Sequence, residues 1–263
     1  MRRPTITLTT DFGLADYFTG AMKGVIRSIC PQADIVDITH EVRPFEIAQG
    51  GFLLAHSAPW FPKKTIHVAI VDPGVGGARR PILVESEGQY FIGPDNGVFG
   101  FIYERSPRRR VREITNVRLL LPEVSGTFHG RDVFAPAAAW LAAGTTPAQF
   151  GRRIEDYLKP PAVRPLQTGR RFWTGTVIHI DRFGNLVSSF RAADFPQFRE
   201  RPFELQVGLI KIGAIAATYE SMGGREPHVI EGSAGYYEVS IREGNAAAAL
   251  GVGLGAPIEL VVY

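Results

Sequence analysis

Two kinds of hydrophobic pattern alternate along the first 165 residues of the chain. Short β-branched or continuous apolar segments predict strands, and apolar residues spaced three and four apart predict helices. The predicted strands are 5–9, 35–38 and 65–71, and the predicted helices are 17–29, 44–56 and a segment capped by Asp132 that runs to Ala143. Because the last two strands lack alternation, we expect both to be buried on both faces of a parallel sheet. The pattern predicts an α/β domain over residues 1–165 with a central, largely parallel sheet.

The pattern changes after Pro160-Pro161. From Phe172 onward, short strand-like segments are separated by glycine turns, and only 245–250 has helical spacing. The predicted strands are 175–180, 186–190, 203–207, 236–241 and 258–262. This arrangement predicts a smaller, mostly antiparallel β domain over residues 172–263.

The composition is that of a globular protein and narrows the range of partners. Hydrophobic residues make up 45% of the chain and charged residues 21%, which excludes a disordered chain. The longest apolar run, 133–143, is too short to span a bilayer, and the basic N-terminus leads directly into a strand pattern. We therefore expect neither a membrane association nor a signal peptide. The net charge of +3 is too small to indicate nucleic acid, and the single cysteine, Cys30, favours a cytoplasmic location.

Four polar clusters interrupt apolar segments at the predicted ends of strands. They are Thr10-Asp11-Phe12-Gly13, Val71-Asp72-Pro73-Gly74-Val75-Gly76-Gly77, Thr127-Phe128-His129-Gly130-Arg131-Asp132 and Asp181-Arg182-Phe183-Gly184-Asn185. Asp or Asn beside Gly is also typical of ordinary turns, so each cluster by itself is ambiguous. Three of the four fall in the α/β half, where ligands bind beyond the carboxyl ends of the strands. Together they favour a functional site.

Metal and phosphate chemistry are the first alternatives to consider. The 74–77 segment lacks the Lys-Ser/Thr ending of a P-loop, which disfavours phosphate binding. Four side chains could be ligands of a hydrolytic metal ion: Asp11, Asp72, His129 and Asp132. Against this, no paired-histidine spacing is present, and Arg79 and Arg131 lie close in sequence to these residues. A metal-dependent hydrolase stays open as an alternative.

In order and spacing, the motifs of this chain resemble those of the S-adenosyl-L-methionine (SAM) hydroxide adenosyltransferases, SAM hydrolases related to fluorinase and chlorinase. The resemblance runs from Thr7 to the C-terminus and rests on TTDFG, IVDITHEV, VDPGVGG, IGPDNG, TFHGRD, FGNLVS and GNAA. It implies an α/β catalytic domain, a β-rich domain that completes the adenosine and SAM site, and a homotrimer with sites between subunits. It also implies hydrolysis of SAM to adenosine and L-methionine by an activated water or hydroxide at ribose C5′. SAM is then the substrate, and no metal or other cofactor is expected.

The resemblance assigns roles to individual residues. Asp72, Arg79 and His129 match the set that activates water. Asp11 matches the residue that holds the ribose hydroxyls, and Phe45 matches an aromatic residue that packs on the ribose. Eight further positions match residues around the methionine and the adenine: Asp181, Phe183, Asn185, Tyr219, Ser233, Glu238, Asn245 and Ala247. The halogenases carry arginine where this chain has Ala234, so the methionine carboxylate must be recognised differently here.

Departures from the halogenases decide between branches of the family. The fluorinase has a fluoride-binding serine where this chain has Gly130 and a tyrosine where it has Asp72, and the halogenase loop near 79–87 is short here. These differences favour hydrolysis over a chlorinase-like reaction. A non-catalytic adenosine- or SAM-binding protein is a further alternative, which would not need the three water-activating residues. The sequence leaves open whether the (S)- or the (R)-sulfonium epimer of SAM is the substrate.

Overall fold

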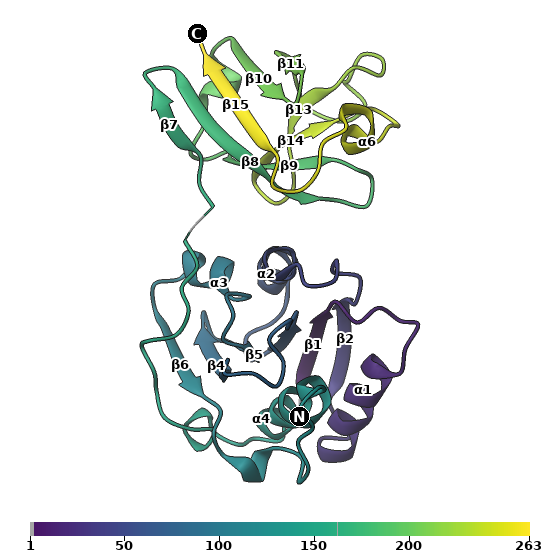
Figure 1. Cartoon of the computed structure of the whole chain (residues 1–263), viewed down its shortest axis with the longest axis vertical. Coiled ribbons are helices and arrows are strands. Elements are labelled where there is room, and N and C mark those ends of the chain that lie inside the picture. The colour runs from purple at the N-terminus through teal and green to yellow at the C-terminus, as the bar shows by residue number, and fades with distance from the viewer. Residues whose placement is uncertain (1–2, 162) are drawn as a thin grey trace. The chain divides into compact units, whose positions relative to one another are not determined.

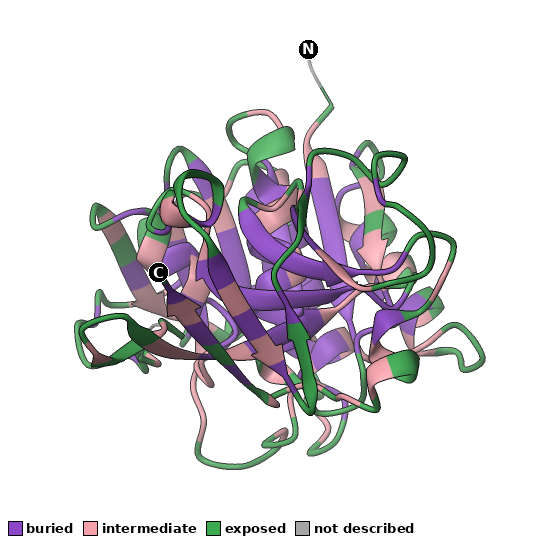
Figure 2. Ribbon diagram, turned by 90° about the horizontal axis from the view of Figure 1, so that it is seen from above, coloured by how far each residue is buried: buried purple, intermediate pink, exposed green. Residues whose placement is uncertain are grey.

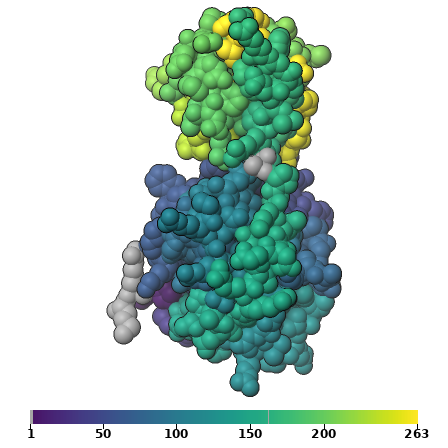
Figure 3. Space-filling view, turned by 90° about the vertical axis from the view of Figure 1, so that its left-hand side faces the viewer, coloured from purple at the N-terminus to yellow at the C-terminus, as the bar shows by residue number. Residues whose placement is uncertain are grey.

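The structure, a computed structural model that describes residues 3–161 and 163–263, divides into two units. They are Met1–Ala162 and Val163–Tyr263, and each is built from a continuous stretch of chain, as the colours of Figures 1 and 3 show. Each unit has its own sheet and its own hydrophobic core. The predicted fold class, α/β followed by mostly antiparallel β, is confirmed.

A six-stranded sheet with the order β2-β1-β3-β5-β4-β6 forms the centre of the N-terminal unit (Figure 1). Its strands are β1 (Thr5–Thr10), β2 (Asp34–Thr39), β3 (Ile66–Ile70), β4 (Pro81–Ser86), β5 (Gln89–Pro94) and β6 (Arg109–Glu113). Only β4 runs antiparallel to its neighbours. The expectation that 35–38 is buried on both faces is wrong, because β2 is an edge strand and is only partly buried. The sequence analysis did not predict β6, four of whose five residues are charged, as in a solvated loop.

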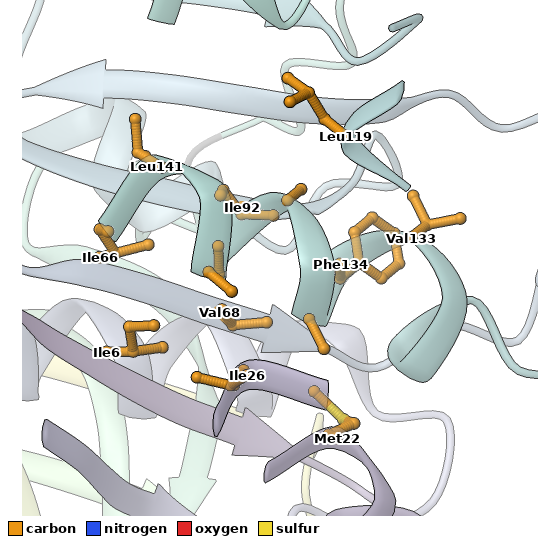
Figure 4. Close-up of a cluster of buried hydrophobic side chains, with 14 of the residues drawn as sticks. Ile6, Met22, Ile26, Ile66, Val68, Ile92, Leu119, Val133, Phe134 and Leu141 are labelled. Carbon is orange, nitrogen blue, oxygen red and sulfur yellow. The ribbon is translucent and has the colours of Figure 1, made fainter. Parts of the chain in front are cut away.

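Helices cover both faces of this sheet. Side chains of β3 alternate between two cores: Ile66, Val68 and Ile70 belong to the core that contains α1 (Phe18–Ile29) and α4 (Ala135–Ala142). Figure 4 shows Ile66 and Val68 in this core. Ala69 faces the other core, with α2 (Ile47–Ser57) and α3 (Gly100–Arg105). In Figure 2 the strands of the sheets are accordingly mostly purple, the colour of buried residues. The predicted parallel layer, closed by helices, is the scaffold that positions the polar clusters.

The predicted helix that follows Asp132 begins earlier than expected. A π-helical turn, Gly130–Phe134, precedes α4, and Gly144 follows the helix with φ 106°. Asp132 therefore lies within the first turns and does not cap the helix. Its buried carboxylate instead accepts hydrogen bonds from the backbone N–H (2.9 Å) and hydroxyl (2.7 Å) of Ser125.

A nine-stranded sheet organises the C-terminal unit, with the path β11-β10-β15-β8-β9-β14-β13-β12 and β7 paired to β8. Its strands are β7 (Leu166–Gly169), β8 (Phe172–Ile180), β9 (Leu186–Arg191), β10 (Phe203–Val207), β11 (Ile210–Ile212), β12 (Ile215–Ala216), β13 (His228–Glu231), β14 (Tyr236–Ser240) and β15 (Pro257–Val262). Only β12 and β13 pair in parallel. The helices are α5 (Gln197–Glu200), which the sequence analysis missed, and α6 (Ala246–Leu250), which it predicted. Across both described stretches, no helix is both long and apolar enough to cross a bilayer.

Candidate active site

Two predicted site carboxylates meet at one edge of the N-terminal sheet. Strands β1 and β3 are parallel neighbours, and their register pairs Thr10 with Ile70. Asp11 and Asp72 follow these two residues closely, so both come to the carboxyl edge of the sheet. Burial raises the pKa of Asp11, and the nearby negative charge of Asp72 raises it further. The parallel sheet thus brings together two carboxylates that are 61 residues apart in sequence, from position 11 to position 72.

A glycine-rich turn brings Asp72 against the loop that carries His129. The turn is closed by a hydrogen bond from the Val75 N–H to the Asp72 carbonyl oxygen (3.2 Å). Gly76 has φ 76°, and a Cβ atom there would lie 2.1 Å from the carbonyl oxygen of Gly126. Only glycine allows this close approach of two backbones. The Gly-rich sequence therefore serves packing at this point, which agrees with the absence of a P-loop ending.

Arg79 connects the other two predicted catalytic residues. Its Nε donates to Asp72 Oδ2 at 2.8 Å, its Nη2 donates to the same oxygen, and Nη2 also lies 2.7 Å from His129 Nδ1. The Asp72 and Arg79 side chains are only 5% and 9% exposed. The guanidinium also lies over the Phe134 ring, 5.3 Å from its centroid. The structure therefore brings Asp72, Arg79 and His129 into one hydrogen-bonded cluster, as the sequence resemblance implied.

The hydrogen-bond pattern fixes the protonation of His129. A guanidinium can only donate, so His129 Nδ1 must accept, and the proton of the neutral ring is on Nε2. Burial and the charge of Arg79 lower the pKa of His129, which favours this neutral form. The ring N–H therefore lies at Nε2, and a hydrogen bond to the backbone of Ser125 acts against the lowering of the His129 pKa.

One oxygen of Asp72 is left free in this cluster. Among the described residues, Oδ1 of Asp72 is buried and has no hydrogen-bond partner, while Oδ2 is occupied by Arg79. Asp72 and His129 both line a cavity of about 100 Å³, together with Gly130 and aromatic residues that include Phe12. A buried, unpaired carboxylate oxygen at a small cavity can accept a proton from a molecule in that cavity.

Asp11 also fixes the backbone at Phe45. The Phe45 N–H donates to Asp11 Oδ2 at 3.0 Å. Phe45 has φ 70°, a conformation that a bulky side chain rarely adopts, and its side chain is 71% exposed. Strained residues of this kind cluster at ligand-binding sites. The geometry therefore links Asp11 and Phe45, which are far apart in sequence.

Asp132 does not belong to this cluster. Besides its bonds from Ser125, its carboxylate forms an ion pair with Arg131 at 2.6 Å. Burial opposes ionisation, but the hydrogen bonds from Arg131 and Ser125 lower the pKa of Asp132 overall. Its geometry is that of a residue that holds the loop before α4. Within the described part of the chain, no group of three or more His, Cys, Asp or Glu side chains could hold a metal ion.

Seven of the eight predicted C-terminal site residues line one pocket of about 780 Å³ in the C-terminal unit. They are Asp181, Phe183, Asn185, Tyr219, Ser233, Glu238 and Asn245. The size is that of a typical small-molecule site. Phe183 is 75% exposed, so its ring is available to a ligand. The eighth residue, Ala247, does not line the pocket; its N–H donates to the Gly184 carbonyl (2.9 Å), and its role toward a ligand stays a prediction.

Asp181 holds the loop between β8 and β9. Its Oδ1 accepts from the N–H groups of Phe183 and Asn185, both at 2.9 Å, and its Oδ2 accepts from the Asn185 side-chain amide at 2.7 Å. Gly184, at φ 87°, lies so close to the Asn245 side chain that a Cβ atom would be 2.2 Å from it. The Asn245 side chain in turn caps α6 by accepting from the Ala248 N–H at 2.8 Å. The FGN motif and the GNAA motif are thus packed against each other.

Glu238 is a buried carboxyl group on the wall of the same pocket. A Cβ atom on Gly232 would lie 1.7 Å from Glu238 Oε1, so the carboxyl group rests directly on that glycine. Burial and the negative charge of Asp181 raise the pKa of Glu238 to about 7. The sequence analysis missed three lining residues, Ile241, Glu243 and Gly244. Ile241 and Glu243 lie just before the GNAA motif and Gly244 is its first residue, and this position is the signal that could have found them.

Comparison with known proteins identifies the family. The family models for the N-terminal and C-terminal domains of SAM hydroxide adenosyltransferases match residues 6–151 and 175–259. The chain belongs to the SAM hydroxide adenosyltransferase family.

Relatives of this adenosyltransferase family member include enzymes of two kinds. An (R)-S-adenosyl-L-methionine hydrolase from Salinispora tropica is 37% identical over 254 residues, 95% of this chain and 94% of that protein. A fluorinase from Actinoplanes sp. is more distant, with 26% identity over 220 residues and 73% of each chain covered. A crystal structure of an uncharacterized conserved protein from Thermotoga maritima superposes with a TM-score of 0.90 at 33% identity, covering 98% of this chain and 99% of that one. The adenosyltransferase fold is thus shared along nearly the whole chain.

Proposed function

We propose that this protein hydrolyses SAM to adenosine and L-methionine by attack of an activated water at ribose C5′. One observation carries the proposal: Arg79 bridges Asp72 and His129 and leaves Asp72 Oδ1 as a buried, unpaired acceptor at a cavity. Free water has a pKa near 15.7, so it needs a proton acceptor or strong polarisation to become a nucleophile.

In the proposed reaction, Asp72 Oδ1 accepts the proton of the water as its oxygen bonds to C5′. Arg79 holds Oδ2 and keeps the carboxylate oriented, and His129, which Arg79 also holds, lines the cavity in which the water is proposed to lie. The C5′–S bond breaks with its electron pair on sulfur, so methionine leaves as a neutral thioether and no general acid is needed. The positive charge of the sulfonium and the negative charge of the Asp72 carboxylate are neutralised in the same step, which a site shielded from water favours.

Two groups of residues are proposed to bind the substrate. Asp11 accepts the ribose hydroxyls, and the exposed ring of Phe45 packs on the ribose. In the C-terminal pocket, the proposed contacts to the adenine and the methionine amine come from Asp181, Phe183, Asn185, Tyr219, Ser233, Glu238 and Asn245, with Ala247 nearby in the GNAA motif. The exposed aromatic rings and the amide of Asn185 suit a purine base.

The substrate epimer and the assembly are further parts of the proposal. We propose the (R)-sulfonium epimer as substrate, supported by the similarity to the (R)-S-adenosyl-L-methionine hydrolase of Salinispora tropica. The family resemblance supports a homotrimer with SAM sites between subunits, and the single buried cysteine supports a cytoplasmic location. Initial rates with each purified epimer, and the mass of the assembly from light scattering, test these points.

An isotope experiment tests the reaction itself. The purified protein in H₂¹⁸O should release adenosine that carries ¹⁸O at its 5′ hydroxyl, in the presence of EDTA and without an added metal ion. Adenosine without the label would show that C5′ is not attacked by water. Loss of activity in EDTA with recovery on adding a divalent ion would favour the metal-dependent alternative, and binding of SAM without turnover would favour a sensor.

The halogenase alternative has its own test. With chloride or fluoride in the assay, we expect no 5′-halo-5′-deoxyadenosine by mass spectrometry. The anionic Asp72 repels a halide at the place where water is proposed to bind. Halogenated nucleoside formed at a rate comparable to adenosine would overturn the assignment to the hydrolase branch.

A further inference from the structure

The C-terminal pocket is acidic. Three carboxylate side chains line it: Asp181, Glu238 and Glu243. None of its described lining residues is Lys, Arg or His. A pocket with this charge attracts a cationic ligand and repels an anionic group.

Two of the three carboxyl groups are held in place by contacts within the unit. Asp181 is held by the three N–H groups of its own loop, and Glu238 is held against Gly232. Glu243 is exposed, in a left-handed turn with φ 51°. Because Asp181 and Glu238 are held before any ligand binds, their repulsion is part of the empty pocket. Burial is the main cause of the raised pKa of Glu238, and the negative charge of Asp181 raises it further.

We propose that this pocket selects adenosyl sulfonium compounds by their cationic amine, and that the protein therefore also hydrolyses decarboxylated SAM. This inference rests on the proposed function. Water oxygen bonds to C5′ and its proton passes to Asp72, while the C5′–S bond breaks with its electron pair on sulfur. The products are adenosine and 3-(methylthio)propylamine, and the amine keeps its proton throughout.

The difference between the two substrates is one charge. SAM carries a sulfonium, an ammonium and a carboxylate, and decarboxylated SAM carries only the two cations. Loss of the carboxylate removes its repulsion from Asp181, Glu243 and the ionised form of Glu238, and leaves the attraction of both cations intact. A site that bound SAM through its carboxylate would instead lose affinity, because its binding group would be left unpaired.

Parallel kinetics with the two substrates test the inference. Adenosine release by the full-length protein is measured for SAM and for decarboxylated SAM of the same sulfonium configuration. We expect kcat/KM for decarboxylated SAM to equal or exceed that for SAM. A value more than about tenfold lower, with SAM turned over normally, would overturn the inference and leave the proposed function standing. If neither compound yields adenosine, the proposed function is wrong and the inference is wrong with it.

A pair of matched variants links the preference to the pocket. Glu243→Gln should lower the ratio of the two kcat/KM values, decarboxylated SAM over SAM, by about two- to fivefold, as expected for an exposed charge. Glu200→Gln, an exposed residue of α5 outside the pocket lining, should leave the ratio unchanged. Equal ratios in the wild type and both variants would show that the pocket charge does not set the preference. Because Glu243 is exposed, its variant is expected to fold normally, which thermal unfolding checks.

Discussion

The two polar sites of this protein differ in how their charges are balanced. In the N-terminal unit, the positive charge of Arg79 balances the negative charge of Asp72, and Arg79 also donates a hydrogen bond to His129. Among the described residues, the Oδ1 atom of Asp72 is the oxygen of this cluster that has no hydrogen-bond partner. In the C-terminal unit, Asp181, Glu238 and Glu243 share a pocket whose described lining residues include no cation. The first arrangement is organised around a single open proton acceptor. The second contains negative charges that a cationic ligand would balance. The proposed catalytic site therefore has its charges paired within the protein, whereas the proposed binding pocket has charges that a ligand would pair.

The largest expected effect comes from breaking the balanced cluster. Asp72→Asn keeps the shape of the side chain and removes its charge, so turnover should fall by about 10²–10⁴-fold, the range of general-base contributions. Affinity for adenosine should change little, because no proton moves when the product binds. Single-turnover kinetics with SAM and calorimetry with adenosine measure the two effects. Equal losses in both would mean that Asp72 is a binding residue.

Removal of Asp11 should separate binding from chemistry in the opposite direction. Asp11→Ala deletes the acceptor proposed for the ribose hydroxyls and releases the Phe45 N–H. Because charge-assisted hydrogen bonds contribute ~1.5–3 kcal/mol each, adenosine affinity should drop at least about tenfold. Asp11→Asn is the control, since it keeps an oxygen for the Phe45 N–H. Unchanged affinity in Asp11→Ala would contradict the assigned role.

The charge imbalance of the C-terminal pocket should appear as a pH-dependent stability. The pKa of Glu238 is raised to about 7, so the protonated group stabilises the folded state. That contribution is present below the unfolded-state pKa, near 4.5, and is lost as the pH rises through about 7. Glu238→Gln is always neutral and should therefore unfold like the wild type near pH 4.5 and be more stable by about 1–3 kcal/mol at pH 8.5.

Urea denaturation across this pH range measures that difference, with Glu200→Gln as the exposed Glu-to-Gln control. If the free energy of unfolding of Glu238→Gln does not rise relative to that of the wild type between pH 4.5 and 8.5, Glu238 is solvated and ionised in the folded protein.

The smallest expected effect concerns His129. Its pKa is lowered by burial and by Arg79, so the neutral ring persists below pH 6.5, and protonation of Nδ1 at lower pH would break the bond from Arg79. Protonation of His129 should therefore lower kcat only below pH 6.5, as an acid limb of the pH profile. His129→Asn, which keeps an acceptor for Arg79, should lack that limb. A limb from His129 above pH 6.5 would contradict the hydrogen-bond pattern.

The sequence was informative where local pattern and packing agree. The β-branched run 5–9, the apolar run 65–71 and the helical spacing of 17–29 each predicted an element that is present, because the two strands are buried almost throughout and the helix buries the residues of one face. It failed at β6, whose charged residues form a strand because Val111 alone supplies its buried contact and β4 supplies its hydrogen bonds. The sequence also predicted wrongly that Asp132 caps a helix, because the Asp132 carboxylate accepts hydrogen bonds from Ser125 and not from the N–H groups of the helix terminus.

By itself, the sequence determined the two-part α/β and β organisation, the identity of the polar motifs and the family they resemble. These depend on the periodicity of side chains and on the order of motifs along the chain. Only the tertiary structure decided which polar groups pair and which stay unpaired. Arg79 contacts His129, which is 50 residues away in sequence, and Asp72 Oδ1 has no hydrogen-bond partner among the described residues. The carboxyl group of Glu238 is buried against Gly232. Pairing and burial are set by contacts between distant segments, and the electrostatics of both sites follow from them.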